Sequence, residues 1–391
     1  MNNSSVYLRA LVSCMQNAYI FFFTLGIYFV YIPWNLERLQ LGETDLGLWL
    51  FIFGVVNLIS NQITGRIIVP KIGTKNIIMI GTVILAFCPY LLIVVDTYLS
   101  FMLVAFPFGA AIGFVIPSNQ TQVSNIENKT NKIYTPIYQA AFSAGSLSGA
   151  LMAAYVIRQD IDPEITFSVM GFIILLSVLI IYFLGLPRSE DSVDPISKFQ
   201  LPKKNIFIFG ILLMFNFATI GIIIDWSSLW LTRDLLAPLF LGGLVIVFFN
   251  AGEIVARLLA SSFIKLLGEK VVGGYLSIIG AVILFTSILT SNLYLIIPAL
   301  VLFGLFTANF IAIVIRQAIK VTTDPISLTV SNLTTLGFSG FIFGPAIVGY
   351  TAKYLGLTFN MYALCVIWGF NGICLIYLMS KKQKNVLGED L

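Results

Sequence analysis

The chain has 391 residues, of which 58% are hydrophobic and only 10% are charged, and its formal net charge is +4. An ordinary soluble domain carries about 25% charged residues, because its surface must be covered by polar groups. The composition therefore excludes a soluble enzyme, a disordered chain and a nucleic-acid-binding protein. The sequence has no histidine, which removes histidine-based catalysis, metal ligation and proton relay.

Twelve apolar stretches follow one another along the chain, and each is long enough for a bilayer-spanning helix, which needs about 20 residues. The first is too long for the core of a signal peptide, so we expect it to be a retained helix. The predicted fold class is an all-α integral membrane protein with twelve transmembrane helices. In chain order the predicted helices cover Leu8–Pro33, Asp45–Thr64, Asn76–Val95, Leu99–Val123, Ile133–Ile157, Ile165–Leu186, Asn205–Leu231, Leu239–Ile264, Val271–Leu289, Leu293–Ile315, Ile326–Ala352 and Leu357–Met379.

The longest polar segment, PRSEDSVDPISKFQLPKK at residues 187–204, separates the sixth and seventh predicted helices. It divides the chain into an N-terminal half, residues 1–186, and a C-terminal half, residues 205–391, with six helices each. If the N-terminus is cytoplasmic, 18 of the 22 Lys and Arg residues fall in cytoplasmic segments. Cytoplasmic loops are enriched in Lys and Arg, so we predict that both termini and this linker are cytoplasmic.

The two halves resemble each other in sequence. Gln62 stands four residues before Arg66 at the end of the second helix, as Glu253 stands before Arg257 in the eighth. GxxxG patterns occur in the fourth, fifth and eleventh helices, and we expect close helix packing there. Two parallel six-helix repeats are a known transporter layout, so the sequence predicts two pseudo-symmetric bundles.

The loop after the second helix carries a recognisable motif. In the major facilitator superfamily it reads G-x-L-x-D-x-x-G-x-[RK]-[RK], and this chain has Gly65, Ile67 and Lys75 in that frame, with Gly73 one place late and Val69 at the acidic position. The chain therefore resembles a major facilitator superfamily transporter, which implies alternating access between the two halves. The resemblance implies gating roles for the residues of this loop and its counterpart, namely Gly65, Arg66, Lys71, Gly73, Lys75, Arg257 and Gly268.

A closer resemblance is to a bacterial inner-membrane subgroup with Asp-Trp-Ser in the seventh helix. Here that stretch reads DWSSLWLTRD from Asp225, and TTLGFSGFIFGPAIVG from Thr334 resembles the eleventh helix of the subgroup. The chain differs at the end of the first helix, where Tyr28 and Tyr31 replace a frequent Trp and Arg, and in the fourth helix, where Ile116 replaces an acid. The resemblance implies a location in the bacterial inner membrane.

Two acidic residues inside predicted helices are candidates for proton coupling. A charge in hydrocarbon costs at least ~2.5 kcal/mol, so each needs a reason. Asp225 is either a titratable group in the substrate cavity or an interfacial acid paired with Arg233. Glu253 is either a proton carrier or, because Arg257 follows four residues later on the same helix face, half of a structural ion pair.

Uncharged polar and aromatic residues on the helices suggest a polar, mostly uncharged cavity. Each amide among them is as consistent with a hydrogen bond between helices as with a ligand contact. The substrate-cavity candidates are Tyr28, Tyr31, Asn119, Gln120, Gln139, Trp226, Ser227, Trp230, Asn250, Asn309 and Thr334.

These observations predict a secondary active transporter for a small polar or amphiphilic solute, working by proton symport, with export by proton antiport as the alternative. A channel and a membrane-embedded enzyme are the non-transport alternatives. The sequence has no GxxxxGK[ST], HExxH or GxSxG motif, and these would mark ATP binding, a zinc protease or a serine nucleophile. We therefore expect no enzymatic activity, no cofactor and no metal, and the expected partners of a monomeric chain are its solute, protons and the lipid bilayer.

Overall fold

The computed structural model describes residues 3–130, 132, 134–191, 204–322 and 326–387. Throughout these ranges the secondary structure is helical, without a strand. Among the described residues, twelve helices are long and apolar enough to cross a membrane. The predicted fold class is confirmed.

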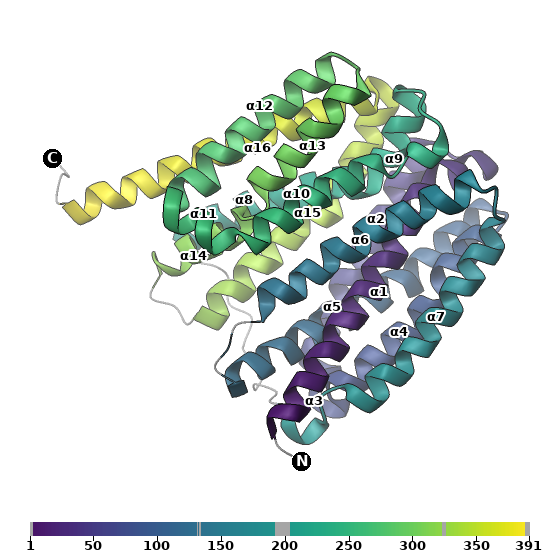
Figure 1. Cartoon of the computed structure of the whole chain (residues 1–391), viewed down its shortest axis with the longest axis horizontal. Coiled ribbons are helices and arrows are strands. Elements are labelled where there is room, and N and C mark those ends of the chain that lie inside the picture. The colour runs from purple at the N-terminus through teal and green to yellow at the C-terminus, as the bar shows by residue number, and fades with distance from the viewer. Residues whose placement is uncertain (1–2, 131, 133, 192–203, 323–325, 388–391) are drawn as a thin grey trace. The chain divides into compact units, whose positions relative to one another are not determined.

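The chain forms two compact units, residues 1–197 with 237–243, and residues 198–236 with 244–391. Figure 1 draws the helices of the first unit in purple to teal and those of the second in green to yellow. The first unit contains α1 (Asn3–Arg38), α2 (Glu43–Ile63), the π-helix η1 (Thr64–Ile68), α3 (Val69–Ile72), α4 (Thr74–Val94), α5 (Tyr98–Thr130), α6 (Thr135–Arg158), α7 (Pro163–Leu184) and the 3₁₀ turns η2 (Arg188–Glu190) and η5 (Leu239–Leu241).

The second unit begins with a helix that is interrupted twice by π-helical turns. Its elements are α8 (Lys204–Gly221), the π-helix η3 (Ile222–Trp226), α9 (Ser227–Leu229), the π-helix η4 (Trp230–Asp234), α10 (Leu244–Leu258), α11 (Ala260–Leu267), the π-helix η6 (Val271–Tyr275), α12 (Leu276–Leu289), α13 (Leu293–Thr307), α14 (Phe310–Ile319), α15 (Ile326–Leu355) and α16 (Leu357–Leu387).

The same helix pairs pack together in both units. In the first, α1 packs on α6, α2 on α5, and α4 on both α5 and α7. In the second, α8 packs on α15, α10 on α13, and α12 on both α13 and α16. The pairing follows the order of the helices in each half, as expected for an internal repeat.

Glycines set the closest of these contacts. Gly145 and Gly149 on α6 face the carbonyl oxygens of Tyr19 and Phe23 on α1, and Gly340 on α15 faces Met214 on α8 in the same way. An added Cβ atom would overlap the neighbouring backbone at each position. The prediction that the GxxxG patterns serve close helix packing is confirmed.

The prediction of a loop directly after Thr64 is wrong. The second helix continues through η1 and α3 to Ile72, and α4 begins at Thr74, so Gly73 alone joins the two. Gly73 has φ +82° and Gly268, which joins α11 to η6, has φ +81°. Such backbone angles favour glycine. The helix continues through Gly65 because a backbone near hydrocarbon must satisfy its own hydrogen bonds.

Other helix boundaries also differ from the predicted ones. The helix predicted from Leu239 starts at Leu244, after a 3₁₀ turn, and the helix predicted to end at Val123 continues to Thr130.

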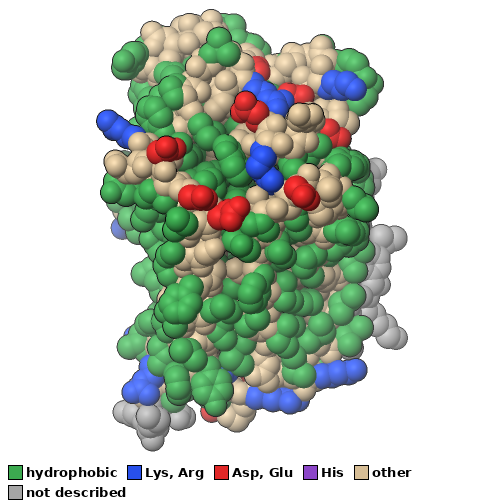
Figure 2. Space-filling model, turned by 90° about the vertical axis from the view of Figure 1, so that its right-hand side faces the viewer, with side chains coloured by type: hydrophobic (Ala, Val, Ile, Leu, Met, Phe, Trp, Pro, Cys, Tyr) green, Lys and Arg blue, Asp and Glu red, His purple; other side chains and the backbone are tan. Residues whose placement is uncertain are grey.

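On the face that Figure 2 shows, hydrophobic side chains cover most of the surface, and acidic and basic side chains gather in its upper and lower parts. This distribution suits a surface that contacts lipid over most of its area.

Candidate functional site

The most irregular backbone in a spanning segment lies between α8 and the end of η4. Two π-helical turns, η3 and η4, flank the single turn of α9 there. π-Helical turns are rare and occur often at functional sites. They place Asp225 and Trp226 in η3 and Ser227 at the start of α9.

Asp225 is buried, with 9% of its surface exposed. Within the described part of the chain, no hydrogen-bond donor and no cation contacts its carboxyl group. The ion pair between Asp225 and Arg233, which was the alternative interpretation, is therefore not formed. A buried acid with no partner is expensive, so its presence calls for a functional reason.

The two residues that follow Asp225 share its lack of partners. Trp226 and Ser227 are both fully buried, and neither the indole Nε1 of Trp226 nor the Oγ of Ser227 meets a partner among the described residues. A buried polar group without a hydrogen bond costs about 1–3 kcal/mol. Three consecutive residues therefore carry buried polar groups that no described residue engages.

Trp230 differs from this group because its polar atom is engaged. Its Nε1 donates to the Thr358 hydroxyl at 2.9 Å. The backbone N–H and the hydroxyl of Thr358 each donate to the Asp234 carboxylate at 2.7 Å. Trp230 and Asp234 thus tie the end of η4 to the beginning of α16, and the indole donor of Trp230 is already used within the protein.

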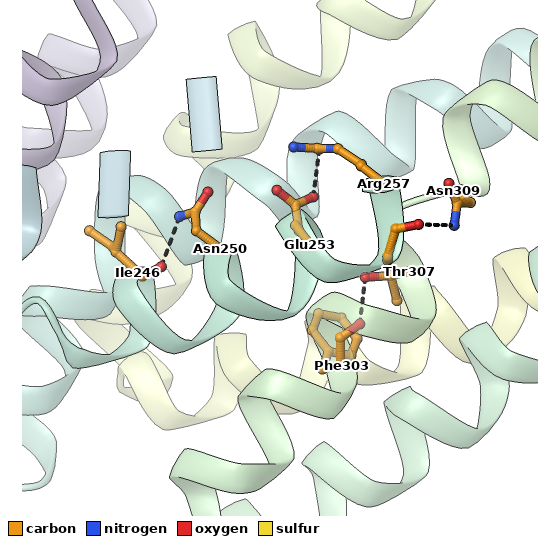
Figure 3. A network of polar contacts seen from close by, with 8 residues as sticks. Ile246, Asn250, Glu253, Arg257, Phe303, Thr307 and Asn309 are labelled. Atoms are coloured by element: carbon orange, nitrogen blue, oxygen red, sulfur yellow. Dashed lines mark hydrogen bonds and ion pairs between the residues drawn. The ribbon is translucent and has the colours of Figure 1, made fainter. Parts of the chain in front are cut away.

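Glu253 and Arg257 form an ion pair on α10 (Figure 3), with 2.8 Å between Glu253 Oε1 and an Arg257 guanidinium nitrogen. The Glu253 side chain is 8% exposed and that of Arg257 is 20% exposed. The expected structural pair is confirmed, while a proton-carrying role for Glu253 stays a hypothesis.

Two predicted cavity amides in the second unit form hydrogen bonds to backbone carbonyl groups near this pair (Figure 3). Asn250 donates to the carbonyl of Ile246, one turn earlier, at 2.8 Å. Asn309, at the joint between α13 and α14, donates to the carbonyl of Ala256 on α10 at 3.3 Å. The side chain of Thr334 lies outside the described residues, although its backbone is part of α15.

In the first unit, Asn119 on α5 is buried and belongs to a chain of polar contacts across three helices. It donates to Asn17 on α1 at 2.6 Å, and Asn17 donates to Thr82 on α4 at 3.0 Å. Asn119 therefore has the role of a hydrogen bond between helices. Of the neighbouring candidates, Gln120 is half-buried and Gln139 is exposed.

The two tyrosines at the end of α1 lie inside an aromatic cluster. Tyr28 packs against Trp49 on α2 and Phe108 on α5, with ring centroids 6.2 and 6.1 Å away. Tyr31 packs edge-on against Phe167 on α7 at 5.3 Å. Both tyrosines are at most 2% exposed, and their rings fill the interior of the first unit.

A cluster of polar contacts around Asp191 in the first unit was not predicted. Asp191, in the polar linker, accepts hydrogen bonds from the backbone N–H of Thr74 at 2.7 Å and from its hydroxyl at 2.8 Å, while Asn125 donates to the other carboxylate oxygen at 3.0 Å. Gln122 donates to the Thr74 hydroxyl at 2.9 Å. Asp191 thus caps the N-terminus of α4, where a negative charge is favourable.

The second unit has an acid at the corresponding place. Glu269 follows Gly268 as Thr74 follows Gly73, and it binds Arg316 at 2.9 Å, Lys320 at 2.8 Å and the amide of Gln317. Burial alone would raise the pKa of Glu269, but the hydrogen bonds and charges of Lys320 and Arg316 outweigh burial and lower this pKa. Gln122 stands 48 residues after Thr74, and Gln317 stands 48 residues after Glu269. This equal spacing in the two halves was the sequence signal that could have indicated both clusters.

The predicted gating residues have separate surroundings. Gly65 lies within η1, Lys71 is exposed at the end of α3, and the Lys75 ammonium lies 5.1 Å from the centre of the Tyr182 ring. The side chain of Arg66 is outside the described residues. Their gating roles stay predictions.

Comparison with known proteins supplies the family. The sequence profile of the Major Facilitator Superfamily matches residues 17–318. The chain belongs to the major facilitator superfamily. Membership makes it a membrane transporter of solutes and not an enzyme.

Curated relatives and solved structures agree with this membership. An uncharacterized MFS-type transporter of Yersinia pestis is 25% identical over 86% of this chain and 88% of its own length. Membrane protein MosC of Rhizobium meliloti is 21% identical over 83% and 79%. The nucleoside transporter NupG has the same fold, with a TM-score of 0.72 and 16% identity over 97% of this chain and 99% of NupG. A bacterial homologue of the lysosomal transporter Spinster gives a TM-score of 0.65 with 12% identity over 96% and 95%.

Proposed function

We propose that this protein is a proton-coupled secondary active transporter that imports a small polar or amphiphilic solute by alternating access. In this proposal Asp225 carries the coupled proton. The proposal also includes a monomer in the bacterial inner membrane with both termini cytoplasmic, as the distribution of Lys and Arg indicates. The observation that carries it is the buried Asp225 carboxyl group without a partner.

The other described acids of the second unit support this choice because each is engaged. Glu253 binds Arg257, Asp234 caps α16 through Thr358, and Glu269 binds Arg316 and Lys320. An acid that releases an ion-pair partner whenever it binds a proton carries an additional energetic cost. Asp225 can take up and release a proton without breaking such a pair.

The elements packed against η3 bring few charges toward Asp225. These elements are α8, α9, α10, α15 and α16. The ionisable residues with described side chains on these elements and on the adjoining η4 are Arg233, Asp234, Glu253, Arg257, Tyr350, Lys353, Tyr354, Tyr362, Cys365, Cys374 and Tyr377. Among the described residues, none of these side chains forms an ion pair or a hydrogen bond with the Asp225 carboxyl group. Protonation of Asp225 would thus depend on the access of water and solute to its own surroundings.

Protonation provides a simple route to coupling. A charge in hydrocarbon costs at least ~2.5 kcal/mol, and a protonated carboxyl group carries none. If solute and proton bind together, the loaded form is neutral at Asp225. The free-energy barrier to rearrangement of the two halves is then lower for this form than for the charged, empty form. The difference in free energy between these forms is then what links the proton to the solute.

The groups beside Asp225 support a solute with both polar atoms and a flat or apolar surface. Trp226 offers an N–H donor, and Ser227 offers a hydroxyl that can donate or accept. Indole rings bind ligands through their faces as well as their N–H group. Nucleosides combine such features, and NupG, whose fold is similar, is a nucleoside transporter. Nucleosides therefore head the solutes to be screened, before sugars, amino acids, peptides and amphiphilic drugs.

The test of this proposal is uptake by purified protein in proteoliposomes. A thermal-shift screen first selects the solutes that raise the melting temperature, because a ligand that binds only the folded state stabilises it. An imposed gradient with acid outside should then drive the selected solute inward against its own gradient, and a protonophore should abolish this. Uphill uptake that is unchanged by the protonophore would refute proton coupling, and uptake driven only by the reverse gradient would indicate antiport.

A further inference from the structure

A cavity of about 270 Å³ lies where α3 joins α4, beside the end of α7. Its lining includes Gly73, Lys75 and Asn76 from the start of α4, Tyr182 from α7, and Arg188 and Asp191 from the segment that follows α7. Two cations and one engaged acid thus face a single hollow within the first unit. Neither the proposed transport site nor the proton carrier uses these residues.

The two cations are held in place by groups that leave their N–H donors available. The aliphatic part of Lys75 lies against Gly185, where an added Cβ would come within 3.2 Å of it, and its ammonium lies 5.1 Å from the centre of the Tyr182 ring. Arg188 donates one hydrogen bond to the carbonyl of Pro70 at 3.5 Å. A guanidinium has five N–H donors and an ammonium has three, so both cations retain donors for an anion.

The acid in the lining does not cancel this charge. The two carboxylate oxygens of Asp191 accept three hydrogen bonds, two from Thr74 and one from Asn125. With Lys75 and Arg188 against Asp191, the formal charge around the cavity is positive. An anion with several acceptor oxygens is the complementary ligand.

The surface next to the cavity is apolar and exposed. Met79 and Tyr182 line the cavity, and the residues that follow them, Ile80 and Phe183, are 46% and 73% exposed. Along the same two helices, which pack together, Phe87 on α4 and Leu179 on α7 are also more than half exposed. Apolar side chains exposed on a spanning helix contact acyl chains.

We propose that this cavity binds the phosphate headgroup of an anionic phospholipid, with Lys75 and Arg188 as its ligands and the acyl chains along the exposed faces of α4 and α7. Basic pockets between transmembrane helices are suited to anionic headgroups. The position of Tyr182 agrees, because tyrosines are enriched at the level of the headgroups. A free phosphate would meet the same cations but would gain nothing from the apolar faces.

The experiment measures lipid binding to the purified full-length protein by native mass spectrometry, with phosphatidylglycerol and phosphatidylcholine as probes. We expect phosphatidylglycerol to bind more tightly. Each cation near a membrane surface contributes about fivefold in affinity, so Lys75→Gln with Arg188→Gln should weaken phosphatidylglycerol binding about 25-fold. Phosphatidylcholine binding should change little.

The matched control is Lys265→Gln with Lys270→Gln, which removes two charges from the corresponding joint of the second unit and should leave the affinity unchanged. Should the double variant fail to fold, Arg188→Gln alone, at an exposed position, should still lose about fivefold. Equal losses in the test and control variants would overturn the site. Inorganic phosphate that competes as strongly as phosphatidylglycerol would overturn the lipid assignment.

Discussion

The Glu253–Arg257 pair gives the sharpest quantitative prediction about stability. Replacing Glu253 with Gln removes the carboxylate that lies 2.8 Å from the Arg257 guanidinium and leaves that charge in a spanning helix, with only 20% of its side chain exposed. Breaking a buried pair costs about 3–5 kcal/mol, whereas an exposed pair on one helix contributes only about 0.3–0.5 kcal/mol. The small exposure of both side chains places this pair near the buried limit, so we expect a loss of about 3 kcal/mol.

The assay is a double-mutant cycle measured by thermal unfolding in detergent. Glu253→Gln and Arg257→Gln should each lower the melting temperature by about 6 °C, taking about 2 °C for each kcal/mol. The double variant retains neither charge, so it should regain most of that loss, with a coupling energy of about 2–3 kcal/mol.

One result would refute this reasoning, and a second would contradict the choice of Asp225 as the proton carrier. If the two single losses simply add in the double variant, then Glu253 and Arg257 do not stabilise each other. If the double variant is stable and binds solute but cannot accumulate it, then Glu253 carries the proton and Asp225 does not.

Three further predictions concern the Asp191 cap, the acid response of Glu269 and the membrane topology. Asp191→Ala should lower the free energy of unfolding by about 2–3 kcal/mol, since charge-assisted hydrogen bonds contribute about 1.5–3 kcal/mol. Asp191→Asn should lose less because it keeps an acceptor for Thr74. Thermal unfolding measures both losses. The folded-state pKa of Glu269 is lowered, so its contribution to stability is complete above its unfolded pKa of about 4.3. This contribution is lost as the pH falls through the folded-state pKa. Glu269→Gln should therefore show a smaller fall of the melting temperature in acid than the wild type. Single cysteines at the exposed positions Lys132 and Gln159 test topology: an impermeant thiol reagent should label Gln159→Cys in intact cells and spare Lys132→Cys.

Each of these has an outcome that contradicts it. Equal stability of Asp191→Ala and the wild type would mean that the cap on α4 contributes nothing. An acid response of Glu269→Gln identical to that of the wild type would remove Glu269 as its source. Labelling of Lys132→Cys from outside would reverse the proposed orientation.

The lengths of the apolar stretches were enough to predict the twelve spans, and the sequence features that the two halves share were enough to predict the repeat. The Glu253–Arg257 pair was also predictable, because a four-residue spacing on one helix fixes which side chains meet. Contacts between side chains on the same helix depend only on local geometry, so they can be predicted from the sequence of that helix.

Contacts between distant segments were not predictable in the same way. Asp191 meets Thr74 only because the linker folds back on the start of α4, and no local pattern encodes that approach. Trp230 was expected to line the cavity, yet its donor binds Thr358 on another helix. The π-helical turns around Asp225 depend on packing against several helices, and propensity gives no signal for them.

The measurement that tests the central claim most directly compares the wild type with Asp225→Asn and Asp225→Glu in proteoliposomes. Asp225→Asn should fold, bind solute and exchange it across membranes at equal pH, but it should not accumulate solute in response to a pH gradient. Asp225→Glu retains a titratable carboxyl group and should retain part of the accumulation. If Asp225→Asn accumulates solute to the wild-type level, Asp225 does not carry the coupled proton, and the proposed mechanism is wrong.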